Sequence, residues 1–356
     1  MITRWIFGQP TALPIFVEFC LCAGLVVLAG TRLSRYGHWI GDVTGLSGAW
    51  VGMVLLACAT SLPELATTVG TVLAVAERHA AADLVFGDLF GSCTFNLLII
   101  VLLDALSRKQ SPLALGRRGQ VLTAAGGAAM LGIAAAGIIL VRVVGLVPPH
   151  LGMLFSVIIL VSYFVMVRIM SSYERAHPGE GDEVNQPPYH GSTSGLVLRF
   201  VAAAGVIVAT GLWLAKIGEA LALVKFRIGG GTFMLGESVV GTLFLAVATS
   251  LPEVVVTVAA FRMGAVNMAL GNLFGSNVFN VAIIPACDLA AGGRLFASGS
   301  TRNLVPLALA VVMTGVAVAG LMRRRKPPPR RLSWNSAVLL ALYIGGMIVL
   351  LSLGSG

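Results

Sequence analysis

Long apolar runs alternate with short polar segments along almost the whole chain. Runs near 20 residues are long enough to cross a hydrocarbon core of about 30 Å as α-helices. We therefore predict ten transmembrane helices, at roughly residues 13–31, 46–76, 82–106, 120–146, 150–170, 196–222, 234–261, 265–289, 303–322 and 334–354. The predicted fold class is an all-α polytopic membrane protein.

One extended polar segment, Ser171–Ser194, separates the ten runs into two groups of five. Its Gly, Pro and Ser content is typical of a flexible linker. We expect a first five-helix repeat over residues 1–172, a cytoplasmic linker over 173–195 and a second five-helix repeat over 196–356.

The two groups also share sequence. Ala57–Val69 matches Ala246–Val258 at nine of 13 positions, and Leu84–Ile100 matches Met268–Ile284 at nine of 17. Because five is an odd number of spans, equivalent segments should cross the membrane in opposite directions. Inverted repeats with interrupted helices are typical of secondary transporters.

Composition supports a membrane protein and charge indicates its orientation. The chain is 57% hydrophobic and 11% charged, whereas soluble domains carry about 25% charged residues. The net charge of +9 comes from short basic clusters between apolar runs, so we expect no nucleic-acid partner. If the N-terminus is outside, 16 of the 24 Lys and Arg lie on the inner side. The positive-inside rule then predicts a protein of the cell (inner) membrane with both termini outside.

The segment ATSLPE occurs twice, at Ala59–Glu64 and Ala248–Glu253, inside apolar runs. A carboxylate at membrane depth costs about 3 kcal/mol or more. Thr60 and Glu64 are four residues apart, so they share a helix face, and Ser61 borders it. Proline lacks an N–H, so Pro63 should free the carbonyl of Ala59, and Pro252 that of Ala248. Each copy therefore offers a carboxylate, hydroxyls and a carbonyl, the hard oxygen ligands that suit Ca²⁺ and Na⁺.

The second repeated segment adds further oxygens. Ser92 and Asn96 are four residues apart, as are Ser276 and Asn280, and Gly91 and Gly275 would let helices cross closely. Two carboxylates balance one divalent cation, two monovalent cations or two protons. Each hydroxyl alone would more often bond to a helix carbonyl, and each proline alone would more often be a packing kink. The duplication of the whole combination favours an ion site.

The duplicated TSLPE and GNxxGSNxxN-like motifs resemble the α-repeats of the calcium/cation antiporter superfamily, which includes the sodium/calcium exchangers. The resemblance implies ten helices in two inverted repeats, with the first and sixth helices sliding across a core of the second, third, seventh and eighth. It also implies Glu64 and Glu253 as central Ca²⁺ ligands. The further ligands it implies are side-chain oxygens and two backbone carbonyls: Thr60, Ser61, Ser92, Asn96, Thr249, Ser250, Ser276, Asn280, Ala57 and Ala246.

The first repeat departs from this pattern at two positions. Asp88 stands where the second repeat has Asn272, and Cys93 stands where it has Asn277. Asp88 would either add a charge to the vestibule or cap or pair locally, and we favour the local role. Potassium-dependent members of the superfamily carry aspartate at the position of Asn280, which argues against potassium dependence.

These patterns predict a secondary-active antiporter, not an enzyme, that exchanges Ca²⁺ for Na⁺ by alternating access. Exchange of Ca²⁺, or of another divalent cation, for H⁺ is the alternative. A cation channel or another non-transporting membrane protein is the alternative of a different class. We expect no cofactor beyond the transported ions, and the expected partners are the lipid bilayer and these cations. The oligomeric state is left open.

Overall fold

The fold is taken from a computed structural model that describes residues 12–107, 110–177, 184, 186–222, 225–228, 231–234, 249–323 and 332–354. Its long helices are α2 (Ala12–Thr44), α4 (Ala57–Ala74), α5 (Arg78–Leu106), α7 (Arg118–Ile138), α8 (Met153–Ala176), α9 (Thr193–Ala222), α11 (Leu251–Arg262), α12 (Val266–Ala290), α14 (Leu304–Arg323) and α15 (Trp334–Gly354). Short helices are α3 (Gly48–Trp50), α6 (Pro112–Leu115), α13 (Leu295–Ser298), the 3₁₀ turns Pro149–Leu151 and Thr301–Asn303, and the π-helical segments Val51–Leu56 and Ile139–Val143. One small antiparallel hairpin pairs β1 (Lys225–Ile228) with β2 (Gly231–Met234).

Nine helical stretches among the described residues are long and apolar enough to span a membrane. They coincide with nine of the ten predicted spans. Half of the expected seventh span, 234–261, lies outside the described residues, and α11 is the helix that the structure describes within it. The all-α membrane fold is therefore confirmed. The hairpin between α9 and α11 is a departure that the apolar pattern did not predict.

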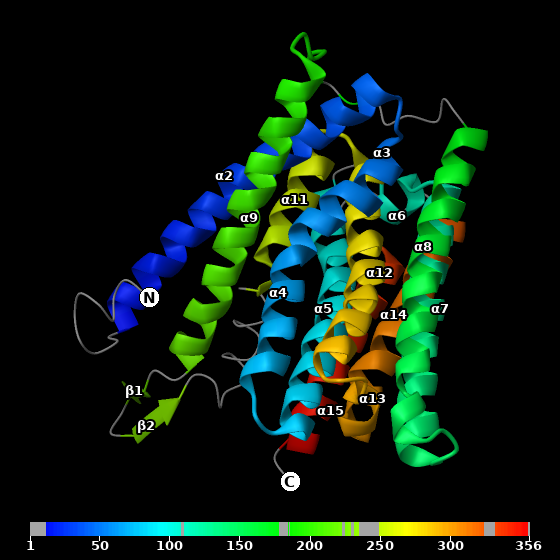
Figure 1. Cartoon of the computed structure of the whole chain (residues 1–356). Coiled ribbons are helices and arrows are strands. Elements are labelled where there is room, and N and C mark those ends of the chain that lie inside the picture. Colours follow the sequence, from blue (N-terminus) through cyan, green and yellow to red (C-terminus); the bar gives the residue numbers. More distant parts are fainter. Residues whose placement is uncertain are drawn as a thin grey trace.

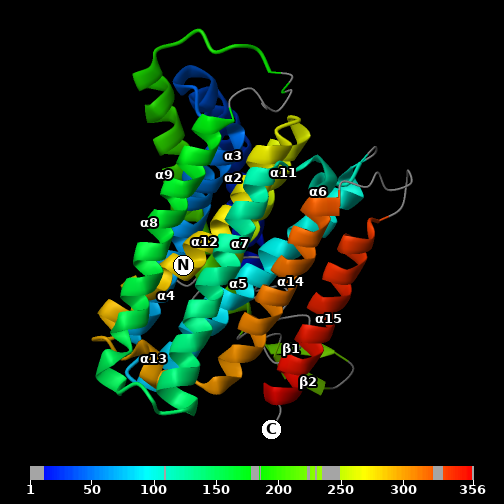
Figure 2. The same ribbon diagram turned by 90° about the vertical axis from the view of Figure 1, so that its right-hand side faces the viewer.

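Three helices form the centre of the bundle. In the most apolar window, 67% of the residues of α5 and of α12 are buried, against 22% in α8 and in α15. The third central helix, α4, packs against both α5 and α12. Helices α2 and α9 lie against each other along one side of this centre, and α7, α14 and α15 cover another (Figures 1 and 2).

The repeats are inverted. Val75, in the turn between α4 and α5, and Arg78, the first residue of α5, line a pocket together with Ala291, which directly follows α12. The start of α5 therefore lies beside the end of its counterpart α12, so the two helices run in opposite directions (Figure 1). Helix α2 begins and α15 ends at this same end of the bundle.

Small residues allow the central helices to approach closely. A Cβ at Gly275 of α12 would lie 2.5 Å from the carbonyl oxygen of Met53, and one at Gly52 would lie 2.2 Å from that of Met268. The π-helical segment before α4 thus crosses α12 at backbone contact, as predicted for Gly275. A Cβ added at Gly91 would have no described atom within 4 Å apart from the adjacent backbone of α5.

Acidic residues outside the centre have structural partners. Asp288, at the end of α12, accepts hydrogen bonds from the Leu295 amide (2.8 Å) and the Ser156 hydroxyl (2.6 Å). Its counterpart Asp104 accepts one from the Ser333 amide (2.6 Å), directly before α15. Glu77 caps α5, and the N–H groups of Ala80 and His79 hold the pKa of its carboxyl below the ordinary value. These acids fix helix ends and are not candidates for ion transport.

Candidate cation-binding site

The first ATSLPE segment lies within α4, with Pro63 inside the helix. Its Thr60 and Ser61 side chains are fully buried, and Glu64 is 3% exposed. The Thr60 hydroxyl lies 3.4 Å from the carbonyl oxygen of Ala57, which is itself buried. Among the described residues, no side-chain hydrogen bond reaches the carbonyl oxygen of Ala59 that the proline should free.

The second copy is built differently. Ser250 directly precedes α11, so Pro252 lies in the first turn of a helix rather than in its interior. Glu253 follows in that first turn and is 1% exposed. Thr249 lies within the described residues and interacts with a neighbouring group, whereas Ala246 and Ala248 lie outside the described residues. The prediction that Pro252 frees the carbonyl oxygen of Ala248 stays a prediction, because Ala248 lies outside the described residues.

Hydrogen bonds join the two repeats at the predicted residues. The Ser61 hydroxyl donates to Oε1 of Glu253 at 3.3 Å. The hydroxyls of Thr60 and Ser276 lie 3.4 Å apart. Glu64 and Glu253 are close enough to interact electrostatically. The structure thus brings residues from the two halves of the sequence into one buried cluster.

Several buried oxygens in this cluster have no hydrogen-bond partner in the described part of the chain. They are the acceptor atoms Glu64 Oε2, Glu253 Oε2, Asn96 Oδ1, Asn280 Oδ1 and Asn272 Oδ1. Buried polar atoms are nearly always paired in proteins, so unpaired acceptors need an explanation. A cation would satisfy several of them at once, because carboxylate and amide oxygens are ligands of Ca²⁺.

Asn277 holds Asn96 in place. The Asn96 amide nitrogen donates to Oδ1 of Asn277 at 3.1 Å, and the Asn277 amide nitrogen donates to the carbonyl oxygen of Cys93 at 3.2 Å. With its nitrogen engaged, Asn96 keeps its oxygen free for a cation. Cys93 also lies beside Asn280. This role of Asn277 was not predicted from the sequence, although its place in the repeated motif was a usable signal.

Threonines one turn beyond the glutamates were also missed. In the second repeat, the Asn272 amide nitrogen donates to the Thr257 hydroxyl at 2.9 Å. In the first, the Thr68 hydroxyl donates to the Glu64 carbonyl oxygen at 2.6 Å. Ser92 is buried on α5, at 6% exposure, and its hydroxyl has no hydrogen-bond partner among the described residues.

Both motif prolines face helix α9. A Cβ at Gly211 would lie 2.7 Å from Cγ of Pro63 and 3.7 Å from Cγ of Pro252. Helix α9 therefore packs on the two halves of the site at one glycine, and α2 packs alongside α9. This places the α2–α9 pair directly over the candidate site.

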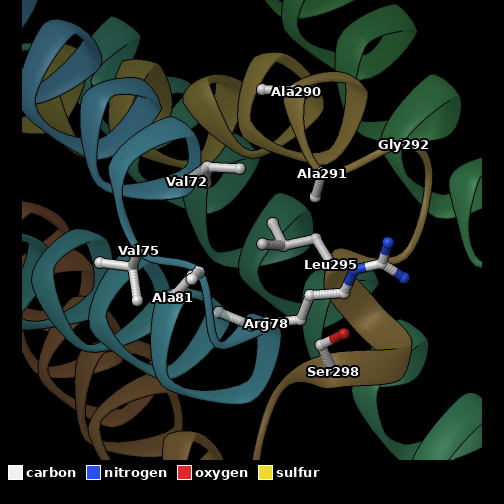
Figure 3. Close-up of a pocket in the computed structure, with 11 residues that line it drawn as sticks. Val72, Val75, Arg78, Ala81, Ala290, Ala291, Gly292, Leu295 and Ser298 are labelled. Carbon is white, nitrogen blue, oxygen red and sulfur yellow. The ribbon is translucent and has the colours of Figure 1, made fainter.

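A pocket of about 350 Å³ opens where α4, α5 and α12 reach the end of the bundle. Figure 3 shows Val72 and Ala81 on one side of it and Ala291 and Leu295 on the other, with Arg78 extending toward α13. Val72 is eight residues from Glu64, so two helical turns of α4 separate the pocket from the first glutamate.

The family follows from a comparison with protein-family models. The model described as "Sodium/calcium exchanger protein" matches residues 15–171 and 195–352. The chain belongs to the sodium/calcium exchanger family. Members of this family are membrane transporters rather than enzymes, so the chain is an integral membrane cation antiporter.

Individual proteins similar to this sodium/calcium exchanger family member match it over different lengths. It is 25% identical to the inner membrane protein YrbG of Escherichia coli over 332 residues, which covers 92% of this chain and 93% of the relative. It is 33% identical to the sodium/calcium exchanger MaX1 of Methanosarcina acetivorans over 120 residues, covering 32% and 31% of the two chains. A solved structure of the sodium-calcium exchanger NCX_Mj superposes with a TM-score of 0.67 at 20% identity, covering 95% of this chain and 99% of that one.

Proposed function

We propose that the chain exchanges Ca²⁺ for Na⁺ across the cell membrane by alternating access. The observation that carries this proposal is the set of unpaired buried oxygens on Glu64, Glu253, Asn96 and Asn280. Two carboxylates compensate the charge of one divalent cation, and the neutral amides and hydroxyls around them suit a weakly bound monovalent ion. The partial relatedness to a protein named a sodium/calcium exchanger supports the same ion pair.

In this proposal, Glu64 and Glu253 bind the divalent cation and neutral oxygens complete the sites for Ca²⁺ and Na⁺. The neutral ligands are Thr60, Ser61, Ser92, Asn96, Thr249, Ser250, Ser276 and Asn280, with the carbonyl oxygens of Ala57 and Ala246. The hydrogen bond from Ser61 to Glu253 holds one carboxylate between the two repeats. An empty pair of carboxylates is unfavourable at membrane depth, so release of one ion species would require loading of the other.

Alternating access would come from the α2–α9 pair. This pair lies over both motif prolines with Gly211 of α9 at the contact, and its movement past the prolines would uncover the site from one side or the other. With both termini outside, as the basic clusters predict, the pocket between α4, α5 and α12 faces outward. Na⁺ entering from outside would then drive Ca²⁺ out of the cytoplasm.

The test is Ca²⁺ flux in proteoliposomes. Vesicles loaded with Na⁺ and diluted into Na⁺-free buffer with ⁴⁵Ca²⁺ should accumulate Ca²⁺, with the membrane potential clamped by valinomycin and K⁺. Uptake driven by a pH gradient in the absence of Na⁺, and none driven by Na⁺, would replace this proposal with Ca²⁺/H⁺ exchange. Conductance far above exchanger turnover would indicate a channel.

Substitution of the glutamates tests the ligand assignment. Glu64→Gln and Glu253→Gln should each abolish Ca²⁺ uptake, because each removes half of the charge that balances the divalent cation. Asp42→Asn is the matched control, since it removes one carboxylate at a site 54% exposed on α2. Ca²⁺ uptake at the wild-type rate by either glutamine variant would remove that residue from the site.

A further inference from the structure

Asp88 is an acidic residue in the middle of the bundle without a structural role. It lies on α5, one turn before Ser92, and is only partly exposed. No hydrogen bond or ion pair to its carboxylate is found within the described chain, so the local capping expected from the sequence has no partner there. A carboxylate in such surroundings is costly unless something compensates its charge.

The second repeat shows which hydrogen bond is lost where aspartate replaces asparagine. Its counterpart Asn272 donates to the Thr257 hydroxyl, which joins α12 to α11. The counterpart of that threonine is Thr68, whose hydroxyl proton already bonds the carbonyl oxygen of Glu64. A carboxylate can only accept hydrogen bonds, so Asp88 cannot repeat the pair. The replacement therefore exchanges a helix–helix hydrogen bond for a negative charge.

This charge lies between the pocket and the two glutamates. On α4, Val72 of the pocket, Thr68 and Glu64 follow at intervals of four residues and so share one face. On α5, Asp88 is seven residues from Ala81 of the pocket and again on one face with it. Cys287 of α12 lies beside Thr68 and near Asp88. By this spacing, Thr68, Asp88 and Cys287 lie between the pocket (Figure 3) and the site, and these three residues are called the neck below.

We propose that Asp88 is a specificity-determining residue of the cation site, whose carboxylate in the neck raises the affinity for divalent over monovalent cations. The inference rests on the proposed function, since it assumes that cations bind at Glu64 and Glu253. Asp88 is within electrostatic range of both glutamates. No group of three or more His, Cys, Asp or Glu side chains forms a metal-ligand cluster in the described part of the chain. Asp88 therefore acts through its field rather than as a third direct ligand.

A field acts in proportion to the charge of the bound ion. The Coulomb energy of a divalent cation with Asp88 is twice that of a monovalent cation at the same place. Removal of the charge should therefore change the logarithm of the affinity twice as much for Ca²⁺ as for each Na⁺. A purely structural role would weaken both ions alike, so this ratio separates the two explanations.

The experiment is equilibrium binding to the purified full-length protein. Asp88→Asn installs the residue that the second repeat carries, and its amide can donate to the Thr68 oxygen, so the variant should fold with an unchanged Tm. We expect its Kd for Ca²⁺, measured with ⁴⁵Ca²⁺, to rise about tenfold, which is about 1.4 kcal/mol. The Na⁺ concentration that half-displaces bound Ca²⁺, corrected for that Kd, should rise only about threefold per bound ion. Asp88→Glu should restore Ca²⁺ binding to within about twofold, and Asp42→Asn should leave both ions unaffected.

Each remaining outcome decides the matter. Wild-type Ca²⁺ affinity in Asp88→Asn, equal losses for Ca²⁺ and Na⁺, or a failure of Asp88→Glu to restore binding would overturn the role of Asp88 alone. Binding that depends on Asp88 as expected, in a protein without Na⁺-driven flux, would overturn the Na⁺ coupling and keep the role of Asp88. A wild-type protein that binds neither Ca²⁺ nor Mn²⁺ would overturn both.

Discussion

Replacement of Asn277 by alanine tests whether the position of the Asn96 oxygen matters for cation binding. Asn277 is 5% exposed and makes two hydrogen bonds, one with Asn96 and one with the Cys93 carbonyl. Side-chain hydrogen bonds inside membrane proteins contribute about 0.6 kcal/mol on average and at most about 1.7. The loss of two should cost about 1–3 kcal/mol of stability, which lowers the Tm without preventing folding.

The effect on binding follows from the freedom that Asn96 gains. Fixing a mobile side chain costs about 0.5–1.5 kcal/mol. If Asn96 must be ordered again on each binding event, the Kd for Ca²⁺ should rise about 2- to 12-fold, at 1.4 kcal/mol per factor of ten. Isothermal titration of Ca²⁺ into the purified protein measures this change, and differential scanning fluorimetry measures the Tm.

Asn303→Ala is the matched control for this variant. Asn303 is 7% exposed and also donates two hydrogen bonds, to Asp83 and to the Ser300 carbonyl, away from the site. Its replacement should lower the Tm comparably and leave the Ca²⁺ affinity unchanged. Wild-type Ca²⁺ affinity in Asn277→Ala, or an equal loss in both variants, would refute the reasoning that Asn277 positions a ligand.

Two glycine positions give further predictions. Gly211→Leu should reduce Ca²⁺ turnover in proteoliposomes at least tenfold and leave equilibrium Ca²⁺ binding within about twofold, because its side chain would wedge α9 against both motif prolines. The control is Gly205→Leu on the same helix, where an added Cβ would have no described atom within 4 Å apart from the adjacent backbone of α9. This variant should transport normally. Similar turnover in the two variants would show that α9 need not pack closely there. Gly275→Ala places a Cβ about 2.5 Å from backbone atoms of Met53 and should cost about 1–3 kcal/mol, seen as a lower Tm. Gly91→Ala at the equivalent position should be tolerated, and equal Tm losses would contradict the close crossing.

The sequence predicted the parts of this protein that depend on local patterns. Apolar run length sufficed for nine described spans, and spacing of four residues placed Thr60 and Glu64 on one face of α4. The duplication predicted that Ser61 and Glu253 come from opposed halves of one site, and the structure joins them by a hydrogen bond. The two-domain division and the individual ligand assignments stay predictions.

Contacts between remote helices could not be predicted in the same way. The bond between Asn96 and Asn277 depends on where α5 and α12 cross, which spacing along one helix does not contain. The two motif prolines are placed differently, with Pro63 inside α4 and Pro252 in the first turn of α11. This difference depends on where α11 begins, and identical motif letters gave no sign of it. The Asp88 carboxylate has no hydrogen-bond partner among the described residues, whereas the Thr68 hydroxyl donates to the carbonyl oxygen of Glu64. Which acceptor Thr68 bonds depends on three-dimensional packing that the sequence does not contain.

The meeting of Cys93 and Asn277, counterparts in the two repeats, has a consequence for how such a chain arises. At a twofold axis a residue faces its own copy, so in a dimer of two identical five-helix chains one mutation alters both sides at once. Two asparagines there would compete for the same acceptors, and two cysteines would be able to form a cross-link that locks the halves together. Joining the copies into one chain removes this constraint. A thiol can then face an amide, and each half can be adjusted separately from the other.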